Sequence, residues 1–244
     1  MRVPSVTELL EAWEQGLDAS LIERMLTLLR PACADLSAEE LEAMPLGRRD
    51  ALLVELRAGL FGSACSTVVA CPGCGEQLES TFPVERMLVE AVPGPPAVIR
   101  LQSGDVQVAF RVPSSGDLLA VTGTGTAPVI RQLLDRCIVE ARGADGAAIG
   151  SADLPEAVVA AVSDGMSAAD PQADVELALA CSSCGTAWTA PFDIASFLWT
   201  EIHSWAQRLL RDVHLLASAY GWRESDVLAL SPVRRNLYLE LIGQ

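Results

Sequence analysis

Apolar residues recur at helical spacing in the first quarter of the chain. Serine and threonine start signals, a glycine break and a proline stop predict an amphipathic helix pair over residues 5–30. A capping box that begins at Ser37 predicts the next helix. After Pro45 and Gly47 interrupt the pattern, residues 48–60 predict a further helix.

The strongest helical pattern lies near the C-terminus, over residues 194–220. Gly221 stops this helix, a short helix is expected to start at Ser225, and a last helix with Pro232 at its first position runs to Ile242. The apolar stripe of the long helix consists of Phe197, Leu198, Ile202, Trp205, Leu209, Val213 and Leu216.

Between these helical regions, alternating apolar and polar residues predict short strands. Two hairpins are expected, one over residues 65–70 and 77–82 and one over residues 98–102 and 106–112, and a further strand at 174–180. Helices are expected at 117–121, 130–141 and 154–162. A stiff connector at 91–97 and loops at 122–128 and 142–152 join these elements.

Two short segments of the chain repeat the same pattern about 110 residues apart: VVACPGCGEQLESTFPVERML and ALACSSCGTAWTAPFDIASFL. Each has an apolar run, then Cys-x-x-Cys-Gly, then an aromatic residue eleven positions after the first cysteine. The repeat extends beyond the cysteines, where Phe82 matches Phe192, Val84 matches Ile194, Met87 matches Phe197 and Leu88 matches Leu198. It indicates a matched pair of knuckles.

Two knuckles supply four thiolates, which is the number that a structural zinc ion requires. The predicted zinc ligands are Cys71, Cys74, Cys181 and Cys184. Four thiolates leave no open coordination position, so one zinc per chain is expected to support the fold without taking part in catalysis. The alternatives are weak metal binding and a pair of redox dithiols, although neither pair stands at the helix start of a βαβ unit.

The predicted fold is α+β and mainly helical, with a small two-knuckle zinc ribbon made of β-hairpins, flanking helices and a long C-terminal helix. Four regions are expected: an N-terminal helical region at 1–63, a split zinc ribbon at 64–90 and 173–193, an inserted hairpin-plus-helices region at 91–172, and a C-terminal helical region at 194–244.

Composition narrows the possible functions. The chain has 244 residues and a net charge of −15, and all 17 of its basic residues are arginine. This acidity argues against nucleic acid as a partner, since phosphate binding rests on concentrated positive charge. The mean hydropathy of +0.31 is high, which favours either a large core or partner contacts. No long uncharged apolar run or signal peptide is evident, so a cytoplasmic protein without membrane insertion is expected.

The remaining candidate residues suggest no enzyme. The three other cysteines are expected to be buried thiols. His203 and His214 share a face of the long helix but lie about 16 Å apart, too far to bind one metal. No nucleophile motif, Walker loop or metalloprotease motif occurs, and no small-molecule substrate is indicated.

Aromatic residues gather in the C-terminal region of a chain that is only 5% aromatic. They are interpreted either as core residues or as part of a docking surface, because Trp, Tyr and Arg are favoured at protein interfaces. The predicted partner-binding residues are Trp222, Arg234, Arg235 and Tyr238.

Three segments resemble the baseplate proteins of T-even-like contractile phages and their relatives in bacterial phage-tail-like contractile injection systems. They are MPLGRRDALLVELRAGLFG (44–62) with the knuckle after it, FDIASFLWTEIHSWAQRLLRDVHLLASAYGW (192–222), and LALSPVRRNLYLELI (228–242). The resemblance covers most of the chain outside residues 90–150. It implies a structural or assembly role without catalysis, with other baseplate or hub subunits as partners.

A second hypothesis keeps the cysteines but changes the role. The chain could be a free-standing zinc-ribbon adaptor or a redox-responsive chaperone that binds exposed apolar segments and loses zinc on oxidation. A nucleic-acid-binding ribbon is a third option, which the net charge disfavours.

Overall fold

The computed structural model describes residues 1–89, 97–122 and 125–243. The chain begins with four helices: α1 (Val6–Gly16), α2 (Leu21–Ala32), α3 (Ala38–Ala43) and α4 (Leu46–Phe61). It ends with the long α8 (Ile194–Tyr220), the short α9 (Glu224–Leu228) and α10 (Pro232–Ile242). The expected α+β, mainly helical fold class is confirmed.

In the described part of the chain, three small antiparallel sheets lie between these helical ends. Two are hairpins: β1 (Ala64–Ala70) with β2 (Gln77–Pro83), and β6 (Glu176–Ala180) with β7 (Ala187–Pro191). The third has the order β3 (Ile99–Ser103), β4 (Val106–Phe110), β5 (Ile138–Arg142). The elements that join them are α5 (Ser115–Ala120), α6 (Thr126–Cys137), α7 (Glu156–Ala169) and the 3-10 turns η1 (Val84–Met87), η2 (Ser151–Asp153) and η3 (Pro171–Ala173).

Three expectations about the elements need correction. The helix expected over 130–141 ends at Cys137, because the chain then extends as β5 and pairs with the open edge of β4, with Ile138 opposite Phe110. Gly47 lies inside the first turn of α4, where the helix was expected to be interrupted. The loop expected at 122–128 gives way to α6 at Thr126. Most of the expected connector at 91–97 and part of that loop are outside the described residues.

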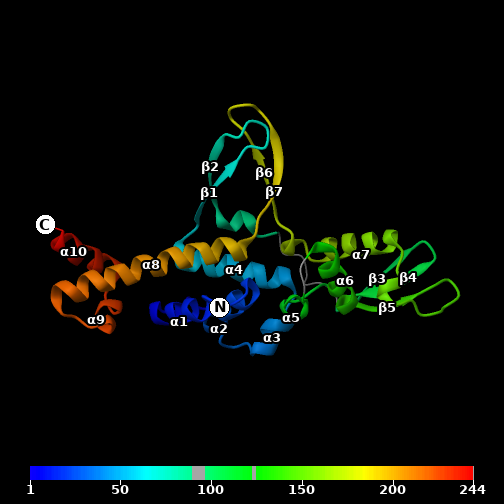
Figure 1. Ribbon diagram of the computed structural model, residues 1–244, viewed down its shortest axis with the longest axis horizontal. Coiled ribbons are helices and arrows are strands. Elements are labelled where there is room, and N and C mark those ends of the chain that lie inside the picture. The colour runs from blue at the N-terminus through cyan, green and yellow to red at the C-terminus, as the bar shows by residue number, and fades with distance from the viewer. Residues whose placement is uncertain (90–96, 123–124, 244) are drawn as a thin grey trace.

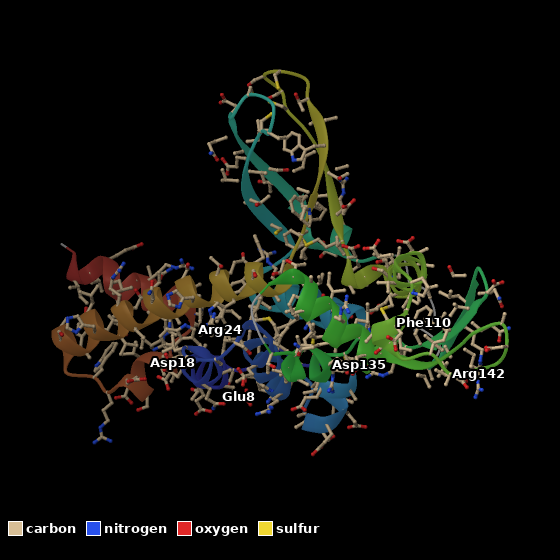
Figure 2. The ribbon with its side chains drawn as sticks, turned by 45° about the vertical axis from the view of Figure 1, so that its right-hand side comes forward. Glu8, Asp18, Arg24, Phe110, Asp135 and Arg142 are labelled. Carbon is tan, nitrogen blue, oxygen red and sulfur yellow. The ribbon has the colours of Figure 1, made fainter. Side chains whose placement is uncertain are left out.

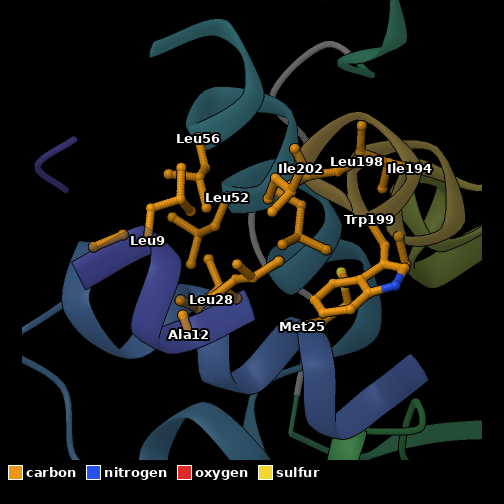
Figure 3. Close-up of a cluster of buried hydrophobic side chains, with 14 of the residues drawn as sticks. Leu9, Ala12, Met25, Leu28, Leu52, Leu56, Ile194, Leu198, Trp199 and Ile202 are labelled. Carbon is orange, nitrogen blue, oxygen red and sulfur yellow. The ribbon is translucent and has the colours of Figure 1, made fainter. Parts of the chain in front are cut away.

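The main core is formed by the apolar faces of α1, α2, α4 and α8. Leu28, Leu53 and Leu198 are fully buried there, and Figure 3 shows side chains from the N-terminal helices meeting those of α8. The stripes that the sequence pattern predicts on α2 and α8 therefore face the same interior. This packing brings the beginning and the end of the chain together.

Two smaller clusters lie on either side of the main core. One joins the β3–β4–β5 sheet to α7 around the fully buried Phe110, at the opposite end of the molecule from α10 (Figures 1 and 2). The other lies between α8, α9 and α10 around Val213, Leu216 and Val227.

The β1–β2 and β6–β7 hairpins stand side by side as an arm that rises from the helical body (Figure 1). The body side of the arm is continuous with α4 before β1 and with α8 after β7. Along each hairpin, half-buried and exposed residues alternate, which fits one face of each hairpin turned toward the other.

Candidate metal centre

The two Cys-x-x-Cys-Gly segments form equivalent turns at the ends of the arm hairpins. In the first, the Cys71 amide donates to the Glu76 carbonyl at 2.8 Å, and the Gly75 amide donates to the Cys71 carbonyl at 2.9 Å. In the second, Cys181 and Gly185 make the same bonds at 2.8 and 3.0 Å. The repeat in sequence is therefore a repeat in structure.

The glycine after each second cysteine has a backbone that L side chains rarely adopt. Gly75 has φ of 77° and Gly185 has φ of 74°. Both turns require this left-handed conformation to return the chain into the second strand. The glycine of each motif is thus explained by the turn itself.

The four sulfur atoms meet between the turns. Cys71 Sγ lies 3.6 Å from Cys184 Sγ, and Cys74 Sγ lies 3.7 Å from Cys181 Sγ. All four lie within 4.8 Å of one another. Cys71 and Cys181 are buried, whereas Cys74 and Cys184 are exposed.

These distances fit a tetrahedral thiolate site. Zinc with sulfur ligands at about 2.3 Å places neighbouring sulfurs about 3.8 Å apart. The same separations are far longer than the S–S bond of a disulfide, about 2.05 Å. The donor set and its spacing therefore suit a soft, tetrahedral metal ion such as zinc.

The thiols of the cluster do not ionise alike. Hydrogen bonds with the hydroxyl and the backbone of Thr186 lower the pKa of Cys184 to about 6. For Cys74 the Glu76 amide lowers the pKa, but hydrogen bonds with Cys184 and the other thiols outweigh it and raise the pKa to about 12. Thiolates this close repel one another, and a divalent cation would remove that repulsion.

The two turns pack tightly against each other. A Cβ added at Gly73 would lie 2.5 Å from Thr186 Oγ1 of the other turn. Gly73 therefore permits a close approach that a larger residue would prevent. This contact was not predicted from the sequence. The only local sign of it is the glycine between Cys71 and Cys74.

At the base of the arm, the residues matched by the repeat enter the body together. The Phe82 and Phe192 rings meet edge to face with centroids 6.5 Å apart. Val84 and Ile194, the next matched pair, are both buried in the main core. The arm is therefore anchored by residues at equivalent positions in the two halves of the repeat.

Arg57 of α4 fastens this base. Its guanidinium pairs with Glu201 of α8 at 2.9 and 2.8 Å and donates to the carbonyls of Gly62 and Ala64 at 2.7 Å each. The side chain is almost completely buried, at 3% exposure. It links α4, the start of β1 and α8, and the sequence analysis did not identify it.

The histidines have separate surroundings. The Trp13 indole donates to His203 Nδ1 at 3.1 Å, which joins α1 to α8. His214 is exposed on α8. Neither lies in the sulfur cluster, which consists of cysteines alone.

The residues predicted to bind partners fall into two groups. Trp222 and Tyr238 are half-buried and pack against each other, with centroids 4.9 Å apart, and against the cluster of α8, α9 and α10. Arg234 is exposed and Arg235 is buried between α10 and α8. The docking role of all four stays a prediction.

The arm lies inside a region that a known family model matches. The model described as T4 bacteriophage base plate protein matches residues 3–199. The chain belongs to this baseplate protein family. The match runs from the N-terminal segment before α1 into α8, so it includes both knuckles of this baseplate protein and leaves residues 200–244 outside.

No curated protein and no solved structure matches this baseplate protein. Among the helices of residues 1–89, 97–122 and 125–243, none combines the length and the apolar character needed to span a bilayer.

Proposed function

We propose that the chain is a structural or assembly component of the baseplate of a phage-tail-like contractile injection system. The family match over residues 3–199 carries this proposal. The proposal assigns no catalysis to the chain, and it places the chain in the bacterial cytoplasm before it joins the injection particle. Other baseplate or hub subunits are the proposed partners.

In this role, one structural zinc ion per chain would be held by Cys71, Cys74, Cys181 and Cys184. The sulfur separations of 3.6 and 3.7 Å support the assignment. A bound zinc would join hairpins that are separated in sequence by a long insertion, and would thereby hold the arm as one rigid projection. The split ribbon at 64–90 and 173–193 and the other three regions expected from sequence are part of this proposal.

The C-terminal helices supply the proposed docking surface. On α10, Val233, Leu237 and Leu241 follow one another at four-residue spacing and are 70, 55 and 60% exposed. An apolar stripe of this kind on an exposed helix is typical of a protein contact.

Metal content tests the zinc assignment. Native mass spectrometry of the purified chain should find one zinc per chain, and Cys71→Ser or Cys181→Ser should lose it. Cys33→Ala is the control, because it removes a buried thiol outside the cluster and should keep the metal. If the chain carries no zinc and Cys71–Cys74 or Cys181–Cys184 disulfides are found, the zinc assignment is wrong and the redox adaptor takes its place.

Co-purification with the other baseplate subunits tests the role. Deletion of residues 223–244 should abolish co-assembly and leave the zinc content unchanged. Since this deletion also uncovers Val213 and Leu216, the milder Leu237→Ser should weaken co-assembly without unfolding the chain. Zinc release by mild oxidant that increases binding to unfolded clients would favour the chaperone alternative instead.

A further inference from the structure

A groove of about 430 Å³ lies between the second half of α8 and α10. Trp205, Leu209 and Asp212 line it from one face of α8, because they follow the helical spacing i, i+4, i+7. Arg208 and Arg211 flank them, and Arg235 closes the groove from α10. The groove lies beyond the part of the chain that the family model matches.

Arg235 lies in this groove without adequate partners. The residue is 8% exposed, and its Nε and Nη1 are buried with no hydrogen-bond partner among the described residues. The nearest carboxylate oxygen, Asp212 Oδ2, is 3.6 Å from Nε, which is too long for a hydrogen bond. Buried donors of a charged group are normally satisfied, so these N–H groups point to a missing acceptor.

The lining of the groove has an excess of positive charge. Three arginines face one aspartate, and neither Arg208 nor Arg211 forms an ion pair with any residue in the described part of the chain. This differs from the molecule as a whole, which has a net charge of −15. Residues 205–244 contain five of the 17 arginines but only four of the 32 acidic residues.

We propose that this groove binds a carboxylate from an acidic segment of a partner protein. Arg235 is the buried pairing group, since its planar guanidinium can present Nη2 together with one of its unpartnered nitrogens as two parallel N–H donors to one carboxylate. Arg208 and Arg211 add charge at the open side and draw the acidic segment in. The inference rests on the docking role proposed above and names the chemistry of the partner.

A protein carboxylate fits the groove better than nucleic acid does. Asp212 also lines the groove and would repel further anions placed near it, so the groove suits one carboxylate beside Arg235 better than a row of phosphates.

Binding of an acidic peptide to the purified, full-length chain tests the proposal. Fluorescence anisotropy at low salt should show a fluorescein-labelled oligoglutamate peptide binding, and oligoglutamine of the same length not binding. Arg235→Gln should weaken the oligoglutamate affinity about tenfold or more. Arg234→Gln is the matched control, because it removes the same charge from the exposed neighbouring position and should change the affinity less than about twofold.

Unfolding midpoints separate binding from folding. Because two buried donors of Arg235 have no hydrogen-bond partner among the described residues and its ion pair with Asp212 is long, at 3.6 Å, Arg235→Gln should not lower the midpoint, whereas loss of a purely structural arginine would. If the Arg235→Gln variant nevertheless unfolds, Arg211→Gln at the exposed side of the groove is used in its place. This variant should weaken the affinity for oligoglutamate by about threefold or more.

Three results would overturn the inference: equal binding of oligoglutamate and oligoglutamine, equal losses from Arg234→Gln and Arg235→Gln, or tighter binding of oligothymidylate that also depends on Arg235. The peptide experiment uses the chain alone, so its failure leaves the baseplate role standing. Unchanged co-assembly in the Leu237→Ser test, with peptide binding intact, would count against the proposed docking role and not against the groove.

Discussion

At Gly47, the first turn of α4 lies directly against the carboxylate of Asp170. The Gly47 amide donates to Asp170 Oδ2 at 2.8 Å across 123 residues of sequence. A Cβ at position 47 would lie 2.0 Å from Asp170 Oδ1, so only glycine permits this contact. The carboxylate accepts a hydrogen bond from an N-terminal amide of α4. No residue near this amide in sequence provides an acceptor for it.

Next to this contact, Asp50 is a largely buried carboxylate, 14% exposed, whose ionisation opposes folding. Burial raises the pKa of Asp50 to about 6 even though Arg49 pairs with it at 2.7 Å and acts to lower the pKa. The folded chain therefore binds a proton that the unfolded chain releases near pH 4. The stabilising effect of that proton is complete below about pH 4 and is lost as the pH rises through 6.

We predict that wild type gains stability relative to Asp50→Asn as the pH falls from 7.5 to 4.5. Between these two pH values, the difference in unfolding free energy between wild type and Asp50→Asn should change by on the order of 2 kcal/mol. Urea unfolding at several pH values measures it. Asp18→Asn, which removes an exposed aspartate, is the control. A pH-independent difference between wild type and Asp50→Asn would contradict the raised pKa.

At the scale of elements, the arm depends on one arginine at its base. Arg57 donates to the carbonyl of Gly62, which precedes β1, to that of Ala64, the first residue of β1, and to Glu201 of α8. It therefore fixes the direction in which the chain leaves α4. Removing it would leave a carboxylate and two carbonyls without their donor in a largely buried place.

We predict that Arg57→Met lowers the free energy of unfolding by about 2–4 kcal/mol. Hydrogen exchange should also speed up at β1, because the clamp on its first residue is lost. Arg48→Met makes the same chemical change at an exposed position of the same helix and should shift stability by less than about 0.5 kcal/mol. An equal effect of the two variants would show that the clamp contributes nothing.

The arm could be predicted from sequence because its pattern is local and occurs twice. The Cys-x-x-Cys-Gly turns need glycine at 75 and 185 for their backbone, and the matched residues Phe82 and Phe192 need the same environment. Arg57 could not be predicted in this way, since its partner Glu201 lies 144 residues away and neither residue has a motif.

The helix predicted over 130–141 was wrong beyond Cys137, where β5 begins, for a related reason. Residues 130–141 have a helical apolar pattern, but Ile138 is needed opposite Phe110 on β4. Pairing with a strand from elsewhere in the chain outweighed the local helical preference. The groove at Arg235 was likewise invisible, because sequence can place Arg235 on a helix but cannot show that its donors lack partners.

At the scale of the whole molecule, the two larger apolar clusters do not share residues. The main core joins α1, α2, α4 and α8, whereas the other cluster joins the β3–β4–β5 sheet to α7. Phe110 fills the second cluster so tightly that a Cβ at Gly165 of α7 would lie 2.8 Å from its ring. The inserted region therefore has apolar packing of its own, which supports the proposed division of the chain.

This separation predicts that the two clusters lose protection independently. Phe110→Ala should lower the free energy of unfolding of the inserted region by about 3–5 kcal/mol. It should also increase hydrogen exchange of β3, β4, β5 and α7. The amides of α2 and α4 should keep their protection, because the main core is untouched. Leu198→Ala, at a fully buried position of α8, should lower the free energy of unfolding of the helical body by about 2–5 kcal/mol. It should increase exchange in α2 and α4 and leave the inserted region protected.

The pair of variants serves as its own control, since each removes a large buried side chain from one cluster only. Exchange mass spectrometry resolved by peptide distinguishes the outcomes. If either substitution raises exchange equally in both regions, the chain unfolds as one cooperative unit and the proposed division is wrong. If each effect stays within its own cluster, the inserted region can loosen while the helical body continues to hold the base of the arm.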